Sequence, residues 1–312
     1  MRIVLIGATG FLGHYLLPRL SSAGHECTAL TRYRPACRDL TVLPRVTVRQ
    51  VKDWSAESFR PILEGADAAV SMAGILNEKG RKGEGFRKVH VELVDQLVMA
   101  CREAGVRRLV HVSALGAGKG ESHYLASKGE AEDLLREAED IDETIVQPSV
   151  IFGRGDAFFN RFATLLKLAP VLPLACPDAR MQPVWAGDVA EVIAQSLSDP
   201  STIGDTLVTV GPHEYRLQEL VEFTADAAGL KRRVLRLPDW MARLQAGLMD
   251  FVPGKPFSTD NYRSLQTPNT SEKNCLWRFG IQPASIEKLA PDYLGPGRHQ
   301  QRLDECRRWV NR

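Results

Sequence analysis

The sequence has few of the features that mark secreted, membrane-spanning or metal-binding proteins. Its six cysteines are scattered without the close pairs that metal sites use, so we expect reduced thiols in a cytosolic compartment. No apolar run approaches the roughly 18 residues that span a bilayer. No signal peptide is evident either, because a strand-like run begins at once.

Charge of one sign is also scarce. Lysine and arginine number 40 against 38 acidic residues, a net charge of +2, which does not predict a nucleic-acid partner. Hydrophobic residues make up 44% and charged residues 25% of the 312, as is usual for a globular enzyme. We expect a soluble, cytoplasmic protein whose contact with a membrane would be peripheral or made through a partner.

The first thirty-two residues carry the clearest motif. A branched apolar run at residues 1–6 leads into Gly-Ala-Thr-Gly-Phe-Leu-Gly at residues 7–13, then into a helical pattern and a second strand-like run. Such a strand, glycine turn, helix and strand predict a dinucleotide-binding unit. Gly7 would allow the tight turn, Gly10 would let a pyrophosphate approach, and Gly13 would let helix and strand pack closely. The alternative is a glycine-rich turn that binds nothing.

The residues after the second strand indicate which cofactor is preferred. Enzymes that prefer NAD usually place an acidic residue here, to bind the ribose 2′-hydroxyl. This chain has Thr31, followed by Arg32 and Arg34. A guanidinium grips a 2′-phosphate well, so the sequence favours NADP(H) over NAD(H). The alternative interpretation is two solvated arginines in a loop.

Further strand-like runs alternate with helical patterns, at residues 45–51, 66–74, 107–113 and 144–153. This alternation predicts an α/β fold with a Rossmann-type, doubly wound parallel sheet and a smaller C-terminal substrate lobe. We expect residues 1–153 to form the dinucleotide-binding domain, with 181–210 returning to it. Residues 154–180 and 211–312 would form the lobe.

A candidate catalytic set follows the strand at 107–113. Ser113 ends that strand, and Tyr124 and Lys128 stand four residues apart, so they share one face of a helix. Tyrosine has a pKa near ~10 and is a poor base at neutral pH, but an adjacent ammonium favours the phenolate and lowers that pKa. The alternative is an ordinary helix surface.

Together these motifs resemble the short-chain dehydrogenase/reductase superfamily in its extended and atypical branches. Residues 144–153 (Thr-Ile-Val-Gln-Pro-Ser-Val-Ile-Phe-Gly), 182–190 and 289–294 narrow the resemblance. With the glycine motif, they look like the atypical reductases related to the nucleotide-binding accessory subunit of mitochondrial complex I and its bacterial relatives. The resemblance covers nearly the whole chain.

The resemblance implies roles for individual residues. Lys128 would hold the nicotinamide ribose, Ser113 would hydrogen-bond the substrate oxygen, and Tyr124 would pass it a proton. Asp53 would meet the adenine, although by itself it fits a turn or a helix N-cap. The expected cofactor-binding set is Gly7, Thr9, Gly10, Phe11, Leu12, Gly13, Arg32, Arg34, Asp53, Ala73, Gly74, Lys128 and Pro148.

One residue departs from the superfamily pattern. His90 stands where the resemblance places an active-site asparagine, in the helical pattern of residues 86–104. A lone histidine of this kind is more often packed within a helix than catalytic.

Two segments have no assigned role. Residues 78–85 form a charged, glycine-rich loop that either meets a substrate or is a solvated connector. Residues 237–251 are apolar and amphipathic, and could cover the core of the lobe, close over a greasy substrate, or dock on a membrane or partner.

Three functions fit these residues. The first is an oxidoreductase that moves hydride between NADP(H) and a carbonyl, an alcohol or a quinone-like substrate, which the intact catalytic set favours. The second is a cofactor-holding accessory or assembly subunit of a quinone-linked respiratory complex, which the narrower resemblance favours. The third is a sugar epimerase or dehydratase, since the same Tyr-Lys pair serves transient oxidation.

Overall fold

A computed structural model describes residues 1–252 and 255–295. The end of the expected C-terminal lobe, residues 296–312, lies outside the described residues and includes Cys306. The other five cysteines are free thiols, as the sequence predicts. None of the helices in the two described ranges is long and apolar enough to cross a membrane.

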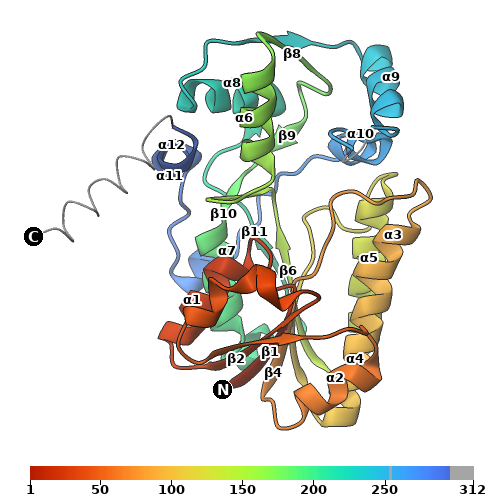
Figure 1. Cartoon of the computed structure of the whole chain (residues 1–312), viewed down its shortest axis with the longest axis vertical. Helices are drawn as coiled ribbons and strands as arrows, with labels where there is room; N and C mark the ends of the chain where they lie inside the picture. Colours follow the sequence, from red (N-terminus) through yellow and green to blue (C-terminus); the bar gives the residue numbers. More distant parts are fainter. Residues whose placement is uncertain (253–254, 296–312) are drawn as a thin grey trace, which may run out of the picture.

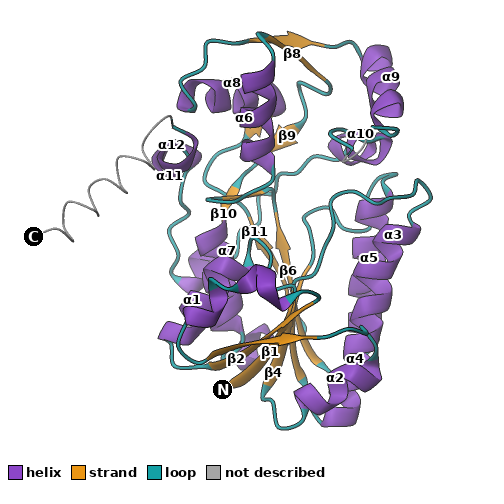
Figure 2. Ribbon diagram, in the orientation of Figure 1, coloured by secondary structure: helices purple, strands orange, loops and turns teal. Residues whose placement is uncertain are grey.

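A seven-stranded sheet forms the larger part of the molecule, and Figure 2 shows its strands in orange. Every pair of neighbouring strands is parallel, in the order β11-β6-β5-β4-β1-β2-β3. Its strands are β1 (Arg2–Ile6), β2 (Glu26–Thr31), β3 (Val46–Gln50), β4 (Ala68–Ser71), β5 (Arg108–Val112), β6 (Asp142–Pro148) and β11 (Thr206–Thr209). The order reverses between β1 and β4, which is where ligands bind in doubly wound sheets. The predicted Rossmann-type fold is confirmed.

Helices cover both faces of this sheet because the strands are apolar on both sides. Against one face lie α1 (Gly13–Ser22) and α7 (Ala186–Ser196), whose leucines and valines share a core with alternate residues of β1. Against the other lie α2 (Ala56–Leu63), α4 (Leu93–Ala104) and α5 (His123–Arg136). Figure 1 shows these two layers on either side of the strands.

The helix expected at residues 86–104 is present but is not regular throughout. It begins as α3 (Glu84–Arg87), widens into the single π-helical stretch η3 (Lys88–Glu92), and continues as α4. Gly105, in the left-handed conformation with φ of 74°, ends it, as glycine commonly does at the C-terminus of a helix. A π-helical stretch inside a helix often marks a functional site, and His90 lies in this one.

A smaller part sits beyond the carboxyl ends of the strands (Figure 1). Its core joins α6 (Phe158–Leu168) and α8 (Leu217–Ala227) to the parallel pair β8 (Val171–Leu174) and β13 (Arg233–Arg236). The remaining elements are η1 (Arg34–Cys37), η2 (Leu40–Val42), β7 (Ile151–Phe152), β9 (Arg180–Met181), β10 (Val184–Trp185), η4 (Pro200–Thr202), β12 (Tyr215–Arg216), α9 (Asp239–Met249), α10 (Thr259–Leu265), η5 (Leu276–Phe279), α11 (Ile286–Leu289) and α12 (Pro291–Leu294). Although α7 and β11 pack with the large sheet, the division into two domains stays a prediction.

Candidate cofactor and substrate site

A cleft of about 2160 Å³ opens at the carboxyl ends of the strands, between the sheet and the smaller part. Small-molecule pockets usually measure roughly 300–1,000 Å³, so this cleft has room for a dinucleotide and a substrate together. Of the residues expected at the site, those that line it are Gly7, Thr9, Gly10, Phe11, Leu12, Arg32, Ala73, Gly74, Ser113, Tyr124, Lys128 and Pro148. Gly13, Arg34 and Asp53 are not part of the lining.

The three glycines of the first turn occupy different surroundings. Gly7 has a φ of 82°, and a Cβ there would lie 2.5 Å from the backbone nitrogen of Ala73. A Cβ on Gly13 would lie 1.8 Å from the carbonyl oxygen of Ala8, so helix α1 could not approach β1. Gly10 is different, because its nearest neighbour would be the Gly7 oxygen at 3.2 Å. The open side of Gly10 faces the cleft, which fits the backbone approach of a pyrophosphate.

The cleft continues past the end of β2. Arg32 and Thr31 both line it, and Thr31 is buried. Arg34 begins the 3₁₀ helix η1, and its backbone N–H donates to Gln50 Oε1 at 3.3 Å. The structure therefore separates the two arginines, and only the first faces the space where a dinucleotide would lie.

Asp53 does not cap the helix that follows it. Ser55 is the N-cap of α2 and accepts a hydrogen bond from the Ser58 backbone N–H at 3.4 Å, so the N-cap interpretation of Asp53 is wrong. Asp53 is exposed, and its neighbours Trp54 and Ser55 line the cleft instead. Contact between Asp53 and an adenine stays a prediction.

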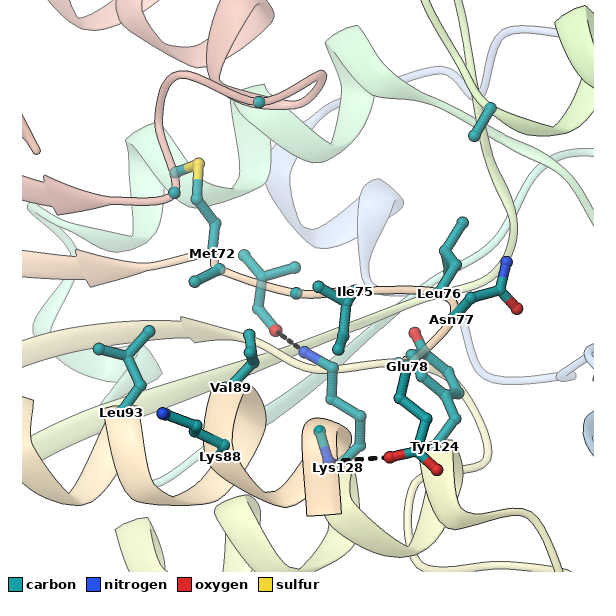
Figure 3. Close-up of a pocket in the computed structure, with 18 of the residues that line it drawn as sticks. Met72, Ile75, Leu76, Asn77, Glu78, Lys88, Val89, Leu93, Tyr124 and Lys128 are labelled. Atoms are coloured by element: carbon teal, nitrogen blue, oxygen red, sulfur yellow. Dashed lines mark hydrogen bonds between the residues drawn. The ribbon is translucent and has the colours of Figure 1, made fainter. Parts of the chain in front are cut away.

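Ser113, Tyr124 and Lys128 all line the cleft, and Figure 3 shows Tyr124 and Lys128 near each other there. Their catalytic roles stay a prediction. Ser113 follows β5 and is buried, and its Oγ has no hydrogen-bond partner among the described residues. A buried hydroxyl without a partner is costly unless a ligand supplies one. This orphaned oxygen at the cleft wall therefore fits a bound carbonyl or hydroxyl.

The start of helix α5 is fixed from two sides. The Ser122 side chain accepts from the Leu125 backbone N–H at 3.0 Å and forms the N-cap. Asp260, from α10 of the smaller part, accepts from the backbone N–H groups of His123 at 2.6 Å and Tyr124 at 3.1 Å. Because a carboxylate is favourable at a helix N-terminus, this contact ties the smaller part to the catalytic helix.

Burial, rather than pairing, sets the protonation of the catalytic pair. Removal from water raises the pKa of Tyr124 to about 12 and lowers the pKa of Lys128 to about 8. The Lys128 ammonium donates to the carbonyl oxygen of Val112 at 3.0 Å. The expectation that the lysine lowers the tyrosine pKa is therefore wrong, because burial raises that pKa instead.

His90 is buried within its helix rather than exposed in the cleft. Its ring is linked to Tyr124 through Ser127. Its Nε2 accepts from the Ile75 backbone N–H at 3.1 Å, and its Nδ1 lies 2.8 Å from Ser127 Oγ. Ser127 Oγ in turn donates to the Tyr124 carbonyl oxygen at 2.8 Å. Because the Ile75 backbone N–H can only donate, Nε2 must accept, and the ring proton is therefore assigned to Nδ1. Burial lowers the pKa of His90 to about 2, so the ring is neutral.

Two further groups of residues carry no signal in the sequence, one buried beside the cleft and one in its lining. His111 on β5 is fully buried, and neither ring nitrogen has a partner among the described residues. Burial and the Lys128 charge lower its pKa well below the usual range. The cleft also takes in Met72, Ile75, Leu76, Asn77, Val150, Phe158, Phe251 and Lys255, of which Figure 3 labels the first four beside Tyr124 and Lys128.

Within the described ranges, no group of three or more histidine, cysteine, aspartate or glutamate side chains could hold a metal ion.

Comparison with known proteins gives one family and several relatives. A family described as NAD(P)H-binding matches residues 7–200. The chain is 28% identical to mouse (Mus musculus) mitochondrial NADH dehydrogenase [ubiquinone] 1 alpha subcomplex subunit 9, over 93% of this chain and 78% of that protein. It is 31% identical to a ceramide reductase from Caulobacter vibrioides, over 76% of this chain and 74% of that protein.

Among solved structures, the fold is similar to an NADPH-dependent quinone oxidoreductase from Escherichia coli, solved with NADPH. The TM-score is 0.74 at 18% identity, over 94% of this chain and 99% of that one. At this identity the likeness concerns the fold alone.

Proposed function

The chain belongs to the NAD(P)H-binding family, as an atypical short-chain dehydrogenase/reductase related to the complex I accessory subunit, and we propose that it is an oxidoreductase that uses NADP(H). The proposed reaction moves a hydride between the cofactor and a carbonyl or alcohol, or a quinone-like acceptor. The observation that carries the proposal is the meeting of Ser113, Tyr124 and Lys128 in the cleft that the glycine turn also lines.

The residues present fit the cofactor. Gly10 leaves space at the turn, helix α1 begins there without a side-chain cap, and Arg32 faces the cleft where a 2′-phosphate would lie. When bound, NADP(H) would supply or accept the hydride. This preference over NAD(H) rests on Arg32 and on the lack of an acid after β2.

The chain's own groups would handle the oxygen of the substrate. Ser113 Oγ, which lacks a partner among the described residues, would donate to that oxygen and orient it. Tyr124, whose raised pKa keeps it protonated, would give the oxygen its proton in the direction of reduction. The Lys128 ammonium would stabilise the phenolate that this leaves, because a nearby opposite charge favours the charged form of the tyrosine.

The apolar lining suggests the kind of substrate. One wall of the cleft is apolar and consists of Met72, Ile75, Leu76, Val89 and Leu93. Figure 3 shows the first three along the chain that leaves β4 and the other two on the neighbouring helix. Such a wall favours a carbonyl compound with a long apolar portion over a sugar nucleotide. The similarity to a ceramide reductase supports the same choice.

The test is reduction of a panel of long-chain ketones, quinones and sugar nucleotides by the purified protein with NADPH, followed by loss of NADPH absorbance. We expect turnover with at least one apolar carbonyl, and its loss by about a thousandfold in Tyr124→Phe with NADPH binding retained. Equal rates for Tyr124→Phe and the unmodified protein would contradict the proposed role of the tyrosine.

A second function is supported by a separate observation. The similarity to the mouse complex I subunit extends over 93% of this chain, so a cofactor-holding subunit of a respiratory complex is the alternative. NADPH that binds and is oxidised by no member of the panel would favour this alternative over the enzyme.

A further inference from the structure

Helix α9 turns its large apolar side chains outward. Trp240, Leu244 and Leu248 recur every four residues and are 66%, 56% and 60% exposed, and Phe251 just beyond the helix is 76% exposed. We call these four residues the apolar row. The side of the helix that faces the protein carries alanines instead, and Ala242 and Ala246 pack on Tyr262 of α10. One expectation was that this helix covers the core of the lobe. Its large apolar residues do not, because they face outward.

A basic loop lies beside the C-terminal end of this row. The Arg81 guanidinium stands 3.9 Å from the centre of the Phe251 ring, and Lys255 Nζ donates to the Gly80 carbonyl oxygen at 2.5 Å. Lys79, Arg81 and Lys82 are exposed. The basic loop, residues 79–82, and the apolar row thus form one continuous surface, although 157 residues lie between the loop and Trp240 in the sequence.

Two of the acidic groups nearest this surface are held by the protein's own groups, whereas Asp239, at the start of α9, is exposed and pairs with Arg243. The Glu78 side chain is buried and accepts from the backbone N–H groups of Gly83 and Gly85, both at 2.8 Å. Asp250 accepts from the backbone and hydroxyl of Thr259, at 3.2 and 2.7 Å, and its carboxylate lies 3.8 Å from Arg81 Nε, so this acid pairs with one base of the loop. Glu84 is exposed. The surface therefore presents the exposed Lys79 and Lys82 beside the apolar row.

We propose that the apolar row and the basic loop dock on the surface of a lipid bilayer that contains anionic lipids. Tryptophan, leucine and phenylalanine on one side of a helix, with basic residues alongside, are the composition that binds membrane interfaces. A second copy of the chain fits this surface less well, because a twofold contact would bring the same basic loops together. The charge complementarity selects anionic headgroups.

The docked orientation would turn the cleft toward the membrane. Phe251 and Lys255, with loop residues 79–82, line the mouth of the cleft, and Figure 1 places α9, α10 and α3 on one side of the molecule. A membrane-resident substrate could then enter the cleft beside the basic loop and reach Tyr124 without crossing water. This consequence rests on the proposed function, whereas the docking does not.

Co-sedimentation with vesicles tests the docking on the full chain. We expect binding to phosphatidylcholine vesicles that contain phosphatidylglycerol, and weaker binding to phosphatidylcholine alone. Leu244→Ser/Leu248→Ser should lower binding to both by about tenfold or more, and Lys79→Ser/Lys82→Ser should remove the preference for the anionic vesicles. Leu168→Ser is the matched control, because Leu168 is 78% exposed and lies on α6, outside this surface.

Several outcomes would overturn the proposal. These are no binding to either kind of vesicle, an equal loss in the Leu168→Ser control, or a dimer in solution that Leu244→Ser/Leu248→Ser abolishes. Stable binding of an acidic protein partner with no vesicle binding would overturn it as well. All of these measurements use ligand-free protein, so they are independent of turnover.

A kinetic measurement tests the consequence for the substrate. With a long-chain ketone presented in anionic vesicles, Leu244→Ser/Leu248→Ser should raise KM by about tenfold and leave kcat unchanged. With a short, water-soluble ketone both constants should stay at their original values. Vesicle binding without any turnover would refute the proposed function and leave the docking intact.

Discussion

The Nζ atom of Lys128 donates a hydrogen bond to the main-chain oxygen of Val112, 3.0 Å away, at the end of β5. This contact holds a buried ammonium in the cleft. Val112 is the last residue of β5, and Ser113 follows it directly. Glu132, one turn further along α5, is the charged group that favours the protonated lysine, but burial outweighs it and lowers the pKa of Lys128 to about 8. The site thus contains a charge that costs stability until a ligand uses it.

Removing this charge should stabilise the chain and abolish its function. We expect Lys128→Met to raise the free energy of unfolding at pH 7 by about 1–3 kcal/mol, because methionine fills a similar space without a buried ammonium. The unfolded pKa is near ~10.4 and the folded pKa is lower, so the penalty is fully present below pH 8 and fades as pH rises toward ~10.4. Urea unfolding at pH 7 and pH 10 measures both effects, and a destabilised variant at pH 7 would contradict them.

Binding of NADPH should depend on the same proton. Negative phosphates favour the charged lysine, so binding raises its pKa and takes up a proton once the free site has lost it. We expect the Kd for NADPH to be flat below pH 8 and to rise by up to about tenfold per pH unit above it. Fluorescence titration from pH 6 to pH 10 measures this. Lys128→Met serves as the control, since its weaker binding should show no such step.

Arg32 and Arg34 should contribute unequally to the choice of cofactor. Arg32 lines the cleft, whereas Arg34 begins η1 outside the lining. We expect Arg32→Ala to raise the Kd for NADPH by about 10- to 100-fold and to leave the Kd for NADH unchanged, because the lost contact is to the 2′-phosphate. Arg34→Ala is the matched control and should change neither. Equal affinity of the unmodified protein for both cofactors would refute the 2′-phosphate argument.

The sequence predicts the frame of this site well because the signals are local. A glycine turn between strand and helix, and a tyrosine four residues before a lysine, each predict their own geometry without tertiary context. The tyrosine pKa depends instead on how deeply Tyr124 is covered, to which Phe86 and His90 contribute from another helix. The periodicity of α9 shows that it has an apolar side, but only the packing of Ala242 and Ala246 shows that this side faces outward.

His90 should act on Tyr124 by positioning it. The neutral ring links the Ile75 backbone N–H to Ser127, whose hydroxyl reaches the Tyr124 carbonyl. We expect His90→Ala to lower kcat by about tenfold or more, and His90→Asn to restore part of it, since an amide also offers a donor and an acceptor. Burial lowers the pKa of His90 to about 2, so His90 should not titrate near ~6.5. The pH profiles of kcat/KM for the unmodified protein and for His90→Asn should therefore have the same shape in this range.

The same substitution at two glycines three residues apart should have opposite consequences. In Gly13→Ala the new methyl group would lie 1.8 Å from the Ala8 carbonyl oxygen, so α1 must move off β1 and we expect a loss of about 3 kcal/mol or more in the free energy of unfolding. In Gly10→Ala the nearest atom would be the Gly7 oxygen at 3.2 Å, so stability should change by less than about 1 kcal/mol. The methyl group on Gly10 would instead occupy the space through which a pyrophosphate approaches, and the Kd for NADPH should rise by about tenfold or more. Thermal unfolding and NADPH titration of the two variants separate these effects, and unchanged NADPH affinity in Gly10→Ala would show that the phosphates bind elsewhere.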